Sequence, residues 1–204
     1  MPIFQAFSSF PDTTFIWKYE DPTDHFSTVQ AAKVPNVVLA AWIPQLDLLA
    51  DHRLSLFISH GGMASCHELA TFGVPALFVP IFGDQIRNAV ALAHNGVAEV
   101  YDKYEINNAD KLKAEIGKML SNTSYMEAAD RLREQLAARP STPAQRLVSH
   151  VEFAARFGPS KSLRPLSLDL SRIQFWGIDL ILIAVGSLVI VTVSVFSLIR
   201  FLFS

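Results

Sequence analysis

Residues 54–73 read Leu-Ser-Leu-Phe-Ile-Ser-His-Gly-Gly-Met-Ala-Ser-Cys-His-Glu-Leu-Ala-Thr-Phe-Gly. The first six of these residues are mostly apolar and are typical of a short buried strand. Gly61 and Gly62 follow directly, and a helical pattern then continues through Phe72 until Gly73 ends it. A strand that turns through glycine into a helix is the repeating unit of parallel α/β sheets, so this stretch decides the fold.

The same alternation of strand and helix extends on both sides of this unit. The sequence predicts further strands at 13–18, 34–40, 75–80 and 97–101, a loop at 21–24, and helices at 84–95, 109–120, 125–138 and 142–157. This order predicts an α/β fold with a doubly wound parallel sheet. Ligands bind such sheets at the carboxyl ends of the strands.

Composition and residue spacing argue against nucleic acid, metal and cofactor binding. The 204 residues carry 17 Lys and Arg against 19 Asp and Glu, a net charge of −2, without a basic run that could follow a nucleic acid backbone. We therefore expect no nucleic acid partner. None of the six histidines has the spacing of metal ligands, so we expect no metal and no cofactor. Cys66 is the only cysteine and is predicted to be a small buried residue.

An uncharged apolar run near the C-terminus predicts a single transmembrane helix. Residues 180–199 contain no charged side chain, and as a helix they would rise about 30 Å, the thickness of a hydrocarbon core. The alternative is a buried core helix, which would usually show a polar edge. The sequence thus predicts a soluble domain at 1–157, a linker at 158–176, a transmembrane helix at 177–199 and a tail at 200–204.

The flanking residues bear on how this helix sits in a membrane. Trp176 and Arg200 suit the two interfaces. Lys161, Arg164 and Arg172 precede the span and only Arg200 follows it, which by the distribution of basic residues would place the large domain in the cytosol. The N-terminal residues have no basic start and no sustained apolar run, so as written the chain is expected to insert by its tail.

Several polar or aromatic residues follow predicted strands and could bind a ligand. His60, Gly61 and Gly62 open a helix, where free N–H groups and the helix dipole attract phosphate; the alternative is a tight structural turn. Glu68 could accept hydrogen bonds from a ribose, or could be a solvated helix carboxylate. Trp42 could stack on a base, or could be a core aromatic residue.

Asp84 and Gln85 begin another helix after a strand. A carboxylate and an amide in this place could hold sugar hydroxyls. The alternative for Asp84 is an ordinary N-terminal cap.

The order and spacing of these residues carry more information than each residue alone. Trp42 to Gln45 read Trp-Ile-Pro-Gln, the strand and His-Gly-Gly turn follow, and then come Glu68, Gly73-Val74-Pro75 and the run Pro-Ile-Phe-Gly-Asp-Gln at 80–85. This string resembles the donor-binding signature of the UDP-glycosyltransferases, the family that includes the UDP-glucuronosyltransferases. The resemblance extends upstream to 15–20 and downstream to Glu152-Phe153, Gly158 and Asp179, and so covers nearly the whole chain.

The resemblance implies a role for each residue of the signature. Trp42 would stack on uracil, Gln45 would hydrogen-bond the uridine and Glu68 would bind the ribose. His60 and the backbone from Gly61 to Ser65 would hold the diphosphate, while Asp84 and Gln85 would hold the sugar that is transferred. The implied donor-binding set is Trp42, Gln45, Ser59, His60, Gly61, Gly62, Ser65, Glu68, Asp84 and Gln85.

The chain also departs from the family pattern. Ala64 stands where most members have Asn, which removes one side-chain contact to phosphate. The family's N-terminal half, with the acceptor pocket and the catalytic base, and the first strand of the C-terminal half are not matched. The implied fold is therefore the C-terminal half of a GT-B glycosyltransferase lacking its first strand. We expect no catalytic base in this chain, because His25, His52, His67, His94 and His150 lack an obvious carboxylate partner.

These features lead to one main functional hypothesis. The chain would supply the UDP-sugar site of a membrane-anchored transferase that moves glucuronic acid or glucose onto small lipophilic hydroxyl compounds, and alone it would be inactive. By resemblance the domain of the complete protein would face the lumen of the endoplasmic reticulum.

Two other hypotheses stay open. One is a non-catalytic membrane protein that binds a UDP-sugar or pairs with a chain carrying the acceptor half, or with a second copy of itself. The other is a hydrolase using Ser65 or Cys66 with His67, which is disfavoured because neighbouring helix residues point about 100 degrees apart.

Overall fold

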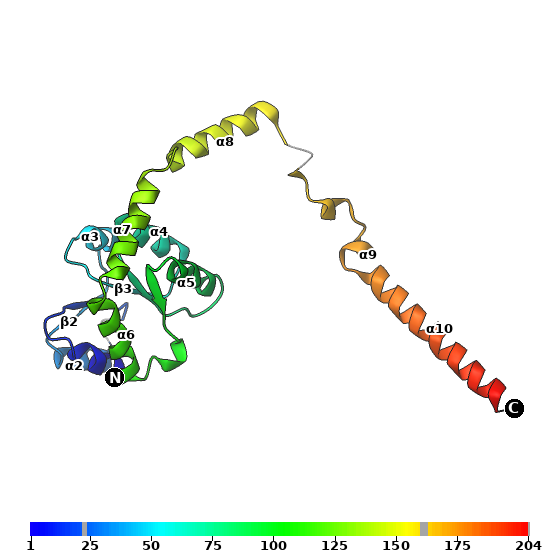
Figure 1. Cartoon of the computed structure of the whole chain (residues 1–204), viewed down its shortest axis with the longest axis horizontal. Coiled ribbons are helices and arrows are strands. Elements are labelled where there is room, and N and C mark those ends of the chain that lie inside the picture. Colours follow the sequence, from blue (N-terminus) through cyan, green and yellow to red (C-terminus); the bar gives the residue numbers. More distant parts are fainter. Residues whose placement is uncertain (22–23, 160–162, 204) are drawn as a thin grey trace. The chain divides into compact units, whose positions relative to one another are not determined.

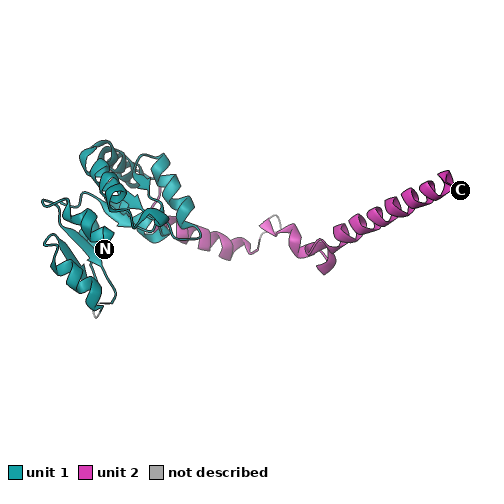
Figure 2. Cartoon of the chain, turned by 90° about the horizontal axis from the view of Figure 1, so that it is seen from below, with its two compact units in different colours: residues 1–140 teal, residues 141–204 magenta. Residues whose placement is uncertain are grey.

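A computed structural model describes residues 1–21, 24–159 and 163–203 (Figure 1). The chain divides into two compact units, residues 1–140 and 141–204 (Figure 2). Part of the predicted loop at 21–24, part of the linker including Lys161, and Ser204 lie outside the described residues. The domain boundary at residue 157 stays a prediction.

All five predicted strands are present in the first unit, each shorter than expected. They are β1 (Phe15–Lys18), β2 (Val37–Ala40), β3 (Phe57–Ser59), β4 (Ala76–Phe78) and β5 (Ala98–Val100). Every pair is parallel, which confirms the predicted α/β class. The ladders form two sheets, β1-β2 and β3-β4-β5, where the sequence suggested one. Among the described strands β1 and β3 each pair on a single side, because no hydrogen-bonded ladder joins them.

Helices connect these strands. In the first unit they are α1 (Pro2–Ser8), α2 (His25–Ala32), α3 (Gln45–Ala50), α4 (Met63–Phe72), α5 (Gln85–His94), the 3₁₀ turn η1 (Lys103–Glu105), α6 (Ala109–Ser121) and α7 (Ser124–Ala137). The helices predicted after residues 62, 84, 109 and 125 are confirmed. The short helices α1, α2 and α3 were missed, although Asp24 caps α2 by accepting hydrogen bonds from the Phe26 and Ser27 amides.

The central strand β4 is buried on both of its faces. Ala76 and Phe78 pack into a core that includes residues of α4, α5 and α7. Leu77, which points to the opposite face, packs into a second core with residues of α1 and α6. Helices therefore cover both sides of the sheet, which is the doubly wound arrangement.

The second unit contains helices only, within the residues that the structure describes. They are α8 (Pro143–Phe157), the 3₁₀ turn η3 (Leu166–Asp169), α9 (Arg172–Phe175) and α10 (Ile178–Leu202). The Thr142 hydroxyl accepts from the Gln145 amide and starts α8 with a capping box. α10 is long and apolar enough to cross a membrane. Its most apolar stretch has a mean hydropathy of 2.6, and none of that stretch is buried. It ends at Leu202, beyond the predicted residue 199, and so includes Arg200.

A partly buried ionic cluster joins β5 to α6 and α7. Lys118 Nζ lies 2.7 Å from Glu99 Oε1, and the Tyr125 hydroxyl donates to the same carboxylate. Burial opposes ionisation of Glu99, but the hydrogen bonds from Lys118 and Tyr125 outweigh it and lower the pKa of Glu99. The Glu99 carboxylate in turn raises the pKa of Lys118.

We expect Lys118→Met to destabilise the fold by about 1 kcal/mol at neutral pH, a small value because solvent screens the pair. Because folding lowers the pKa of Glu99, the ionised carboxylate stabilises the folded state at pH values above its unfolded pKa of about 4.3. This stabilisation is lost as the pH falls through the pKa of Glu99 in the folded state. Because folding raises the pKa of Lys118, the protonated amine stabilises the folded state fully at pH values below its unfolded pKa of about 10.4. The cost of the substitution should therefore be constant from about pH 5 to 10 and shrink below about pH 4.

Urea unfolding of the detergent-solubilised chain across this pH range measures the effect. Lys111→Met is the matched control, because Lys111 lies on the same helix and pairs with the more exposed Glu105. A cost for Lys118→Met that does not change with pH would contradict the ionic role.

Candidate functional site

The residues singled out in the sequence gather at the carboxyl ends of three strands. Trp42 and Gln45 follow β2, His60 to Gly62 follow β3, and Asp84 and Gln85 follow β4. β3 and β4 run in parallel register, with Ser59 opposite Phe78, so their ends meet at one edge of the sheet. This is the edge at which doubly wound sheets bind ligands.

Two glycines allow a close approach at the centre of this edge. Gly61 has a φ of +84°, and a Cβ there would lie 3.1 Å from the Gln85 carbonyl oxygen and 3.5 Å from Phe78. A Cβ at Gly62 would lie 2.7 Å from His60 Nε2, so the imidazole lies over this residue. Gly61 requires glycine for its backbone angle and its contact with a backbone oxygen, whereas a Cβ at Gly62 would have to displace the His60 ring.

The start of α4 offers backbone donors to a ligand. Gly62 is the N-cap residue, and no side chain caps the helix. The first N–H groups of a helix have no intrahelical partner and carry the positive end of its dipole. Ala64, in this first turn, is exposed and brings no polar side chain. The turn therefore presents backbone N–H groups beside the His60 ring, an arrangement that suits an anion.

Three predicted residues from α3 and α4 lie together. Gln45 Nε2 donates a short hydrogen bond to Glu68 Oε2 and lies 3.5 Å from Ser65 Oγ. The side chains expected to bind uridine and ribose are thus held in one cluster. Ser59, also predicted as a donor contact, uses its carbonyl to accept from the Val79 amide within the sheet. A contact between Ser59 and a ligand stays a prediction.

Trp42 is not a core aromatic residue, because 78% of its surface is exposed. Lys18 Nζ lies 5.4 Å from the centroid of the indole and also pairs with Glu20. Lys18 was not predicted from the sequence, and its position as the last residue of β1 was the available signal. The indole therefore lies exposed after the carboxyl end of β2 and can stack on a flat group.

The start of α5 is organised differently from the sequence expectation. Asp84 is the N-cap residue of α5, as the alternative expected, but its side chain makes no capping hydrogen bond; its Oδ2 accepts from Asn88 Nδ2 at 2.9 Å. Gln85 is buried, with 7% of its surface exposed, and its Oε1 accepts from the Ile81 and Phe82 amides. Within the described residues these bonds use only Oε1, so Gln85 Nε2 can donate to a ligand. Asn88 was missed, and its spacing of four residues from Asp84 was the signal that could have found it.

The hydrolase hypothesis gains no support from the geometry. Cys66 is buried, and burial together with the charge of Asp84 raises the pKa of its thiol, the opposite of an activated nucleophile. Ser65 Oγ lies beside Gln45, not beside His67.

His52 differs from the expectation that it lacks a carboxylate partner. Its Nδ1 lies 3.9 Å from Asp51. The Asp51 carboxylate already accepts hydrogen bonds from the Arg53 guanidinium, so it is not free to act as a partner for His52 alone.

The described residues contain no group of three or more His, Cys, Asp or Glu that could hold a metal. The expected absence of metal and cofactor stays a prediction.

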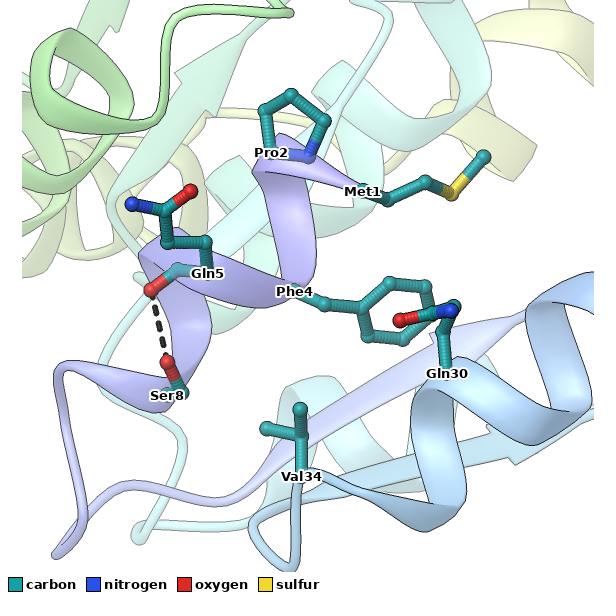
Figure 3. A pocket seen from close by; sticks show the side chains of 7 residues that line it. All are labelled: Met1, Pro2, Phe4, Gln5, Ser8, Gln30 and Val34. Carbon is teal, nitrogen blue, oxygen red and sulfur yellow. Dashed lines mark hydrogen bonds between the residues drawn. The ribbon is translucent and has the colours of Figure 1, made fainter.

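Two depressions in the surface lie away from these residues. One, of about 420 Å³, is lined by residues of α1 and α2, with the Phe4 ring directed toward Gln30 (Figure 3). A second, of about 820 Å³, lies on the outer face of α5 around Ile86 and Val90. Neither contains a predicted donor residue.

Comparisons with known proteins agree with this geometry. The sequence model of the family described as "UDP-glucoronosyl and UDP-glucosyl transferase" matches residues 1–204. The chain is 32% identical to UDP-glycosyltransferase UGT5 of Dactylopius coccus over 191 residues, which cover 94% of the chain and 35% of that relative. It is 36% identical to UDP-glucuronosyltransferase 2A3 of Homo sapiens over 166 residues, 81% of the chain and 30% of that relative.

A solved structure extends the comparison to the fold. The glycotransferase of kitacinnamycin matches with a TM-score of 0.59 and 28% identity, covering 67% of this chain and 34% of that one. Its GT-B fold confirms the fold class predicted from the sequence. The chain spans about a third of the length of the curated relatives it matches. By its signature, its parallel sheet and these matches, the chain belongs to the UDP-glycosyltransferase family.

Proposed function

We propose that this chain supplies the UDP-sugar site of a glycosyltransferase that moves a hexose or glucuronic acid to small lipophilic acceptors. The observation that carries the proposal is that the His60 turn and Asp84 follow the neighbouring parallel strands β3 and β4, while Gln45, from the segment after Trp42, bonds Glu68 of α4. Trp42, the Gln45–Glu68 pair, the His60 turn and Asp84 match, in order, the flat base, the ribose diol, the diphosphate and the sugar of the donor.

The chemistry follows from the charge that develops when UDP leaves. In an inverting transfer a base takes the proton of an acceptor hydroxyl, and the acceptor oxygen forms a bond to the anomeric carbon while the bond from that carbon to the diphosphate oxygen breaks. The bonding electrons go to the diphosphate, whose negative charge grows. The uncapped start of α4 presents fixed backbone donors at this place, with the His60 ring beside them, and fixed dipoles stabilise developing charge without reorganisation.

The acceptor site and the catalytic base would come from a region outside this chain, in the same protein or in a partner. The length of the relatives supports this, because the chain spans about a third of the curated relatives it matches. A binding-only role is the second candidate. This role is favoured because His52 is poorly suited to act as a catalytic base. Asp51, the carboxylate beside His52, is already bonded to the Arg53 guanidinium.

UDP should bind the detergent-solubilised chain, and UDP-sugar transfer by the chain alone should be undetectable. Calorimetry with UDP tests the first statement, and release of radiolabelled sugar from UDP-glucose or UDP-glucuronic acid tests the second. CDP is the matched control, because it keeps the diphosphate and changes only the base. No heat with UDP at millimolar concentration would refute the donor site, and turnover by the isolated chain would refute the binding-only role.

Trp42→Ala should weaken UDP binding by about 1–3 kcal/mol, the range for losing a base stacked on an aromatic ring. Because 78% of the Trp42 surface is exposed, replacing this residue should not lower the unfolding temperature. Calorimetry with UDP and with uridine measures the loss, which should be similar for both ligands.

His60→Ala is the contrasting variant. It should weaken binding of UDP more than binding of uridine, because the imidazole lies beside the glycines that would face the diphosphate. Unchanged affinity in a folded Trp42→Ala chain would show that the indole does not stack. Equal losses for both ligands in His60→Ala would show a structural histidine.

We also propose that α10 anchors the chain in the endoplasmic reticulum with the first unit in the lumen, as resemblance to UDP-glucuronosyltransferases suggests. In microsomes containing the complete protein, protease added from the cytosolic side should leave the donor domain intact, and detergent should expose it to digestion. Digestion without detergent would contradict the lumenal orientation and would favour the cytosolic one indicated by the basic residues before the span.

A further inference from the structure

A buried amide links the two halves of the candidate donor site. Asn88, near the start of α5, has only 7% of its surface exposed. Its Nδ2 donates to the Gly61 carbonyl oxygen at 3.1 Å and to Asp84 Oδ2 at 2.9 Å. An amide nitrogen carries two hydrogens, so both are used. One bond reaches the glycine turn before α4, and the other reaches the acid that precedes α5.

The bond to Gly61 fixes the direction of a backbone donor. A trans peptide is planar, so its carbonyl and its N–H point in opposite directions. No described peptide bond is cis. Holding the Gly61 carbonyl against α5 therefore turns the N–H of Gly62, the N-cap residue of α4, away from α5. The close packing of Gly61 on the Gln85 carbonyl oxygen leaves this peptide little freedom to rotate.

The bond to Asp84 fixes a carboxylate. The Asn88 amide donates to Asp84 Oδ2, and no hydrogen bond to Asp84 Oδ1 occurs within the described residues. An exposed aspartate would otherwise sample several rotamers. With one oxygen held, the second is presented in a defined direction, ready to accept from a hydroxyl group.

We propose that Asn88 is a positioning residue that sets the diphosphate-binding turn and the sugar-binding carboxylate in register for one UDP-sugar. This rests on the proposed function of the site. Asn88 touches no substrate; it acts through the Gly61–Gly62 peptide and through Asp84. UDP alone needs only the first of these, whereas a UDP-sugar needs both.

The near-isosteric variant Asn88→Asp tests this inference through its pH dependence. When ionised, the carboxylate introduced at position 88 cannot donate to either oxygen, and it repels both Asp84 and the Gly61 carbonyl. When protonated, the same group can donate one hydrogen bond again. The other titratable groups nearby are Asp84, Cys66 and His60, so every affinity is divided by that of the unaltered chain at the same pH.

Calorimetry of the full chain with UDP-glucose and with UDP, from about pH 5 to 8, gives the readout. At the upper end of this range the affinity of Asn88→Asp for UDP-glucose should fall by about tenfold or more and its affinity for UDP by less, with recovery as the pH is lowered. Asn95→Asp is the matched control, because Asn95 lies at the exposed end of the same helix and its side chain bonds the Ala91 carbonyl. It should bind as the unaltered chain does.

A second measurement keeps the inference testable if Asn88→Asp is destabilised. The double variant Asn88→Asp with Asp84→Asn restores a donor and an acceptor between positions 84 and 88, so the two changes should be strongly non-additive for UDP-glucose. Losses that add, or that stay equal for UDP and UDP-glucose at every pH, would overturn the positioning role while leaving the donor site intact. Absence of binding to the unaltered chain would refute the proposed function and this inference together.

Discussion

The contact between the glycine turn and the first turn of α5 is the constraint on which the site depends. Gly61 adopts a left-handed backbone angle and packs on the Gln85 carbonyl, while Asn88 donates to the Gly61 carbonyl. This holds the turn after β3 against the helix that follows β4, and the start of α4 is left without a side-chain cap. A larger residue at position 61 would separate the two helices, and the groups at the edge would no longer face one ligand.

The fold could be predicted largely from the sequence, because its main signals are local. Short apolar runs rich in β-branched or aromatic residues located all five strands, and glycine after residue 72 located the end of α4. The short helices α1 and α3 lack a side-chain cap and span only one or two turns, so local patterns carry no strong signal for them. The division into two ladders depends on pairing between distant strands, which local patterns do not encode.

The candidate site was predictable as a set of residues but not as a network. Motif order located His60 and Asp84, which follow the neighbouring strands β3 and β4, and Trp42, which follows β2 of the other sheet. The hydrogen bond from Gln45 to Glu68 joins two helices, and the burial of Gln85 depends on the Ile81 loop folding back over it. Such contacts arise from tertiary packing and become visible only when the chain is folded.

The three tryptophans lie in three different surroundings, and this gives the molecule a natural optical signal. Trp17 packs among Phe4, Phe7 and Tyr19, whereas Trp42 is open to water on the sheet edge. Trp176 lies just before α10. An indole in water emits at longer wavelength than one in an apolar cluster, so the red part of the fluorescence spectrum belongs chiefly to the exposed rings. A base stacked on Trp42 would quench part of that emission, which makes the intrinsic fluorescence of this chain a direct reporter of occupancy.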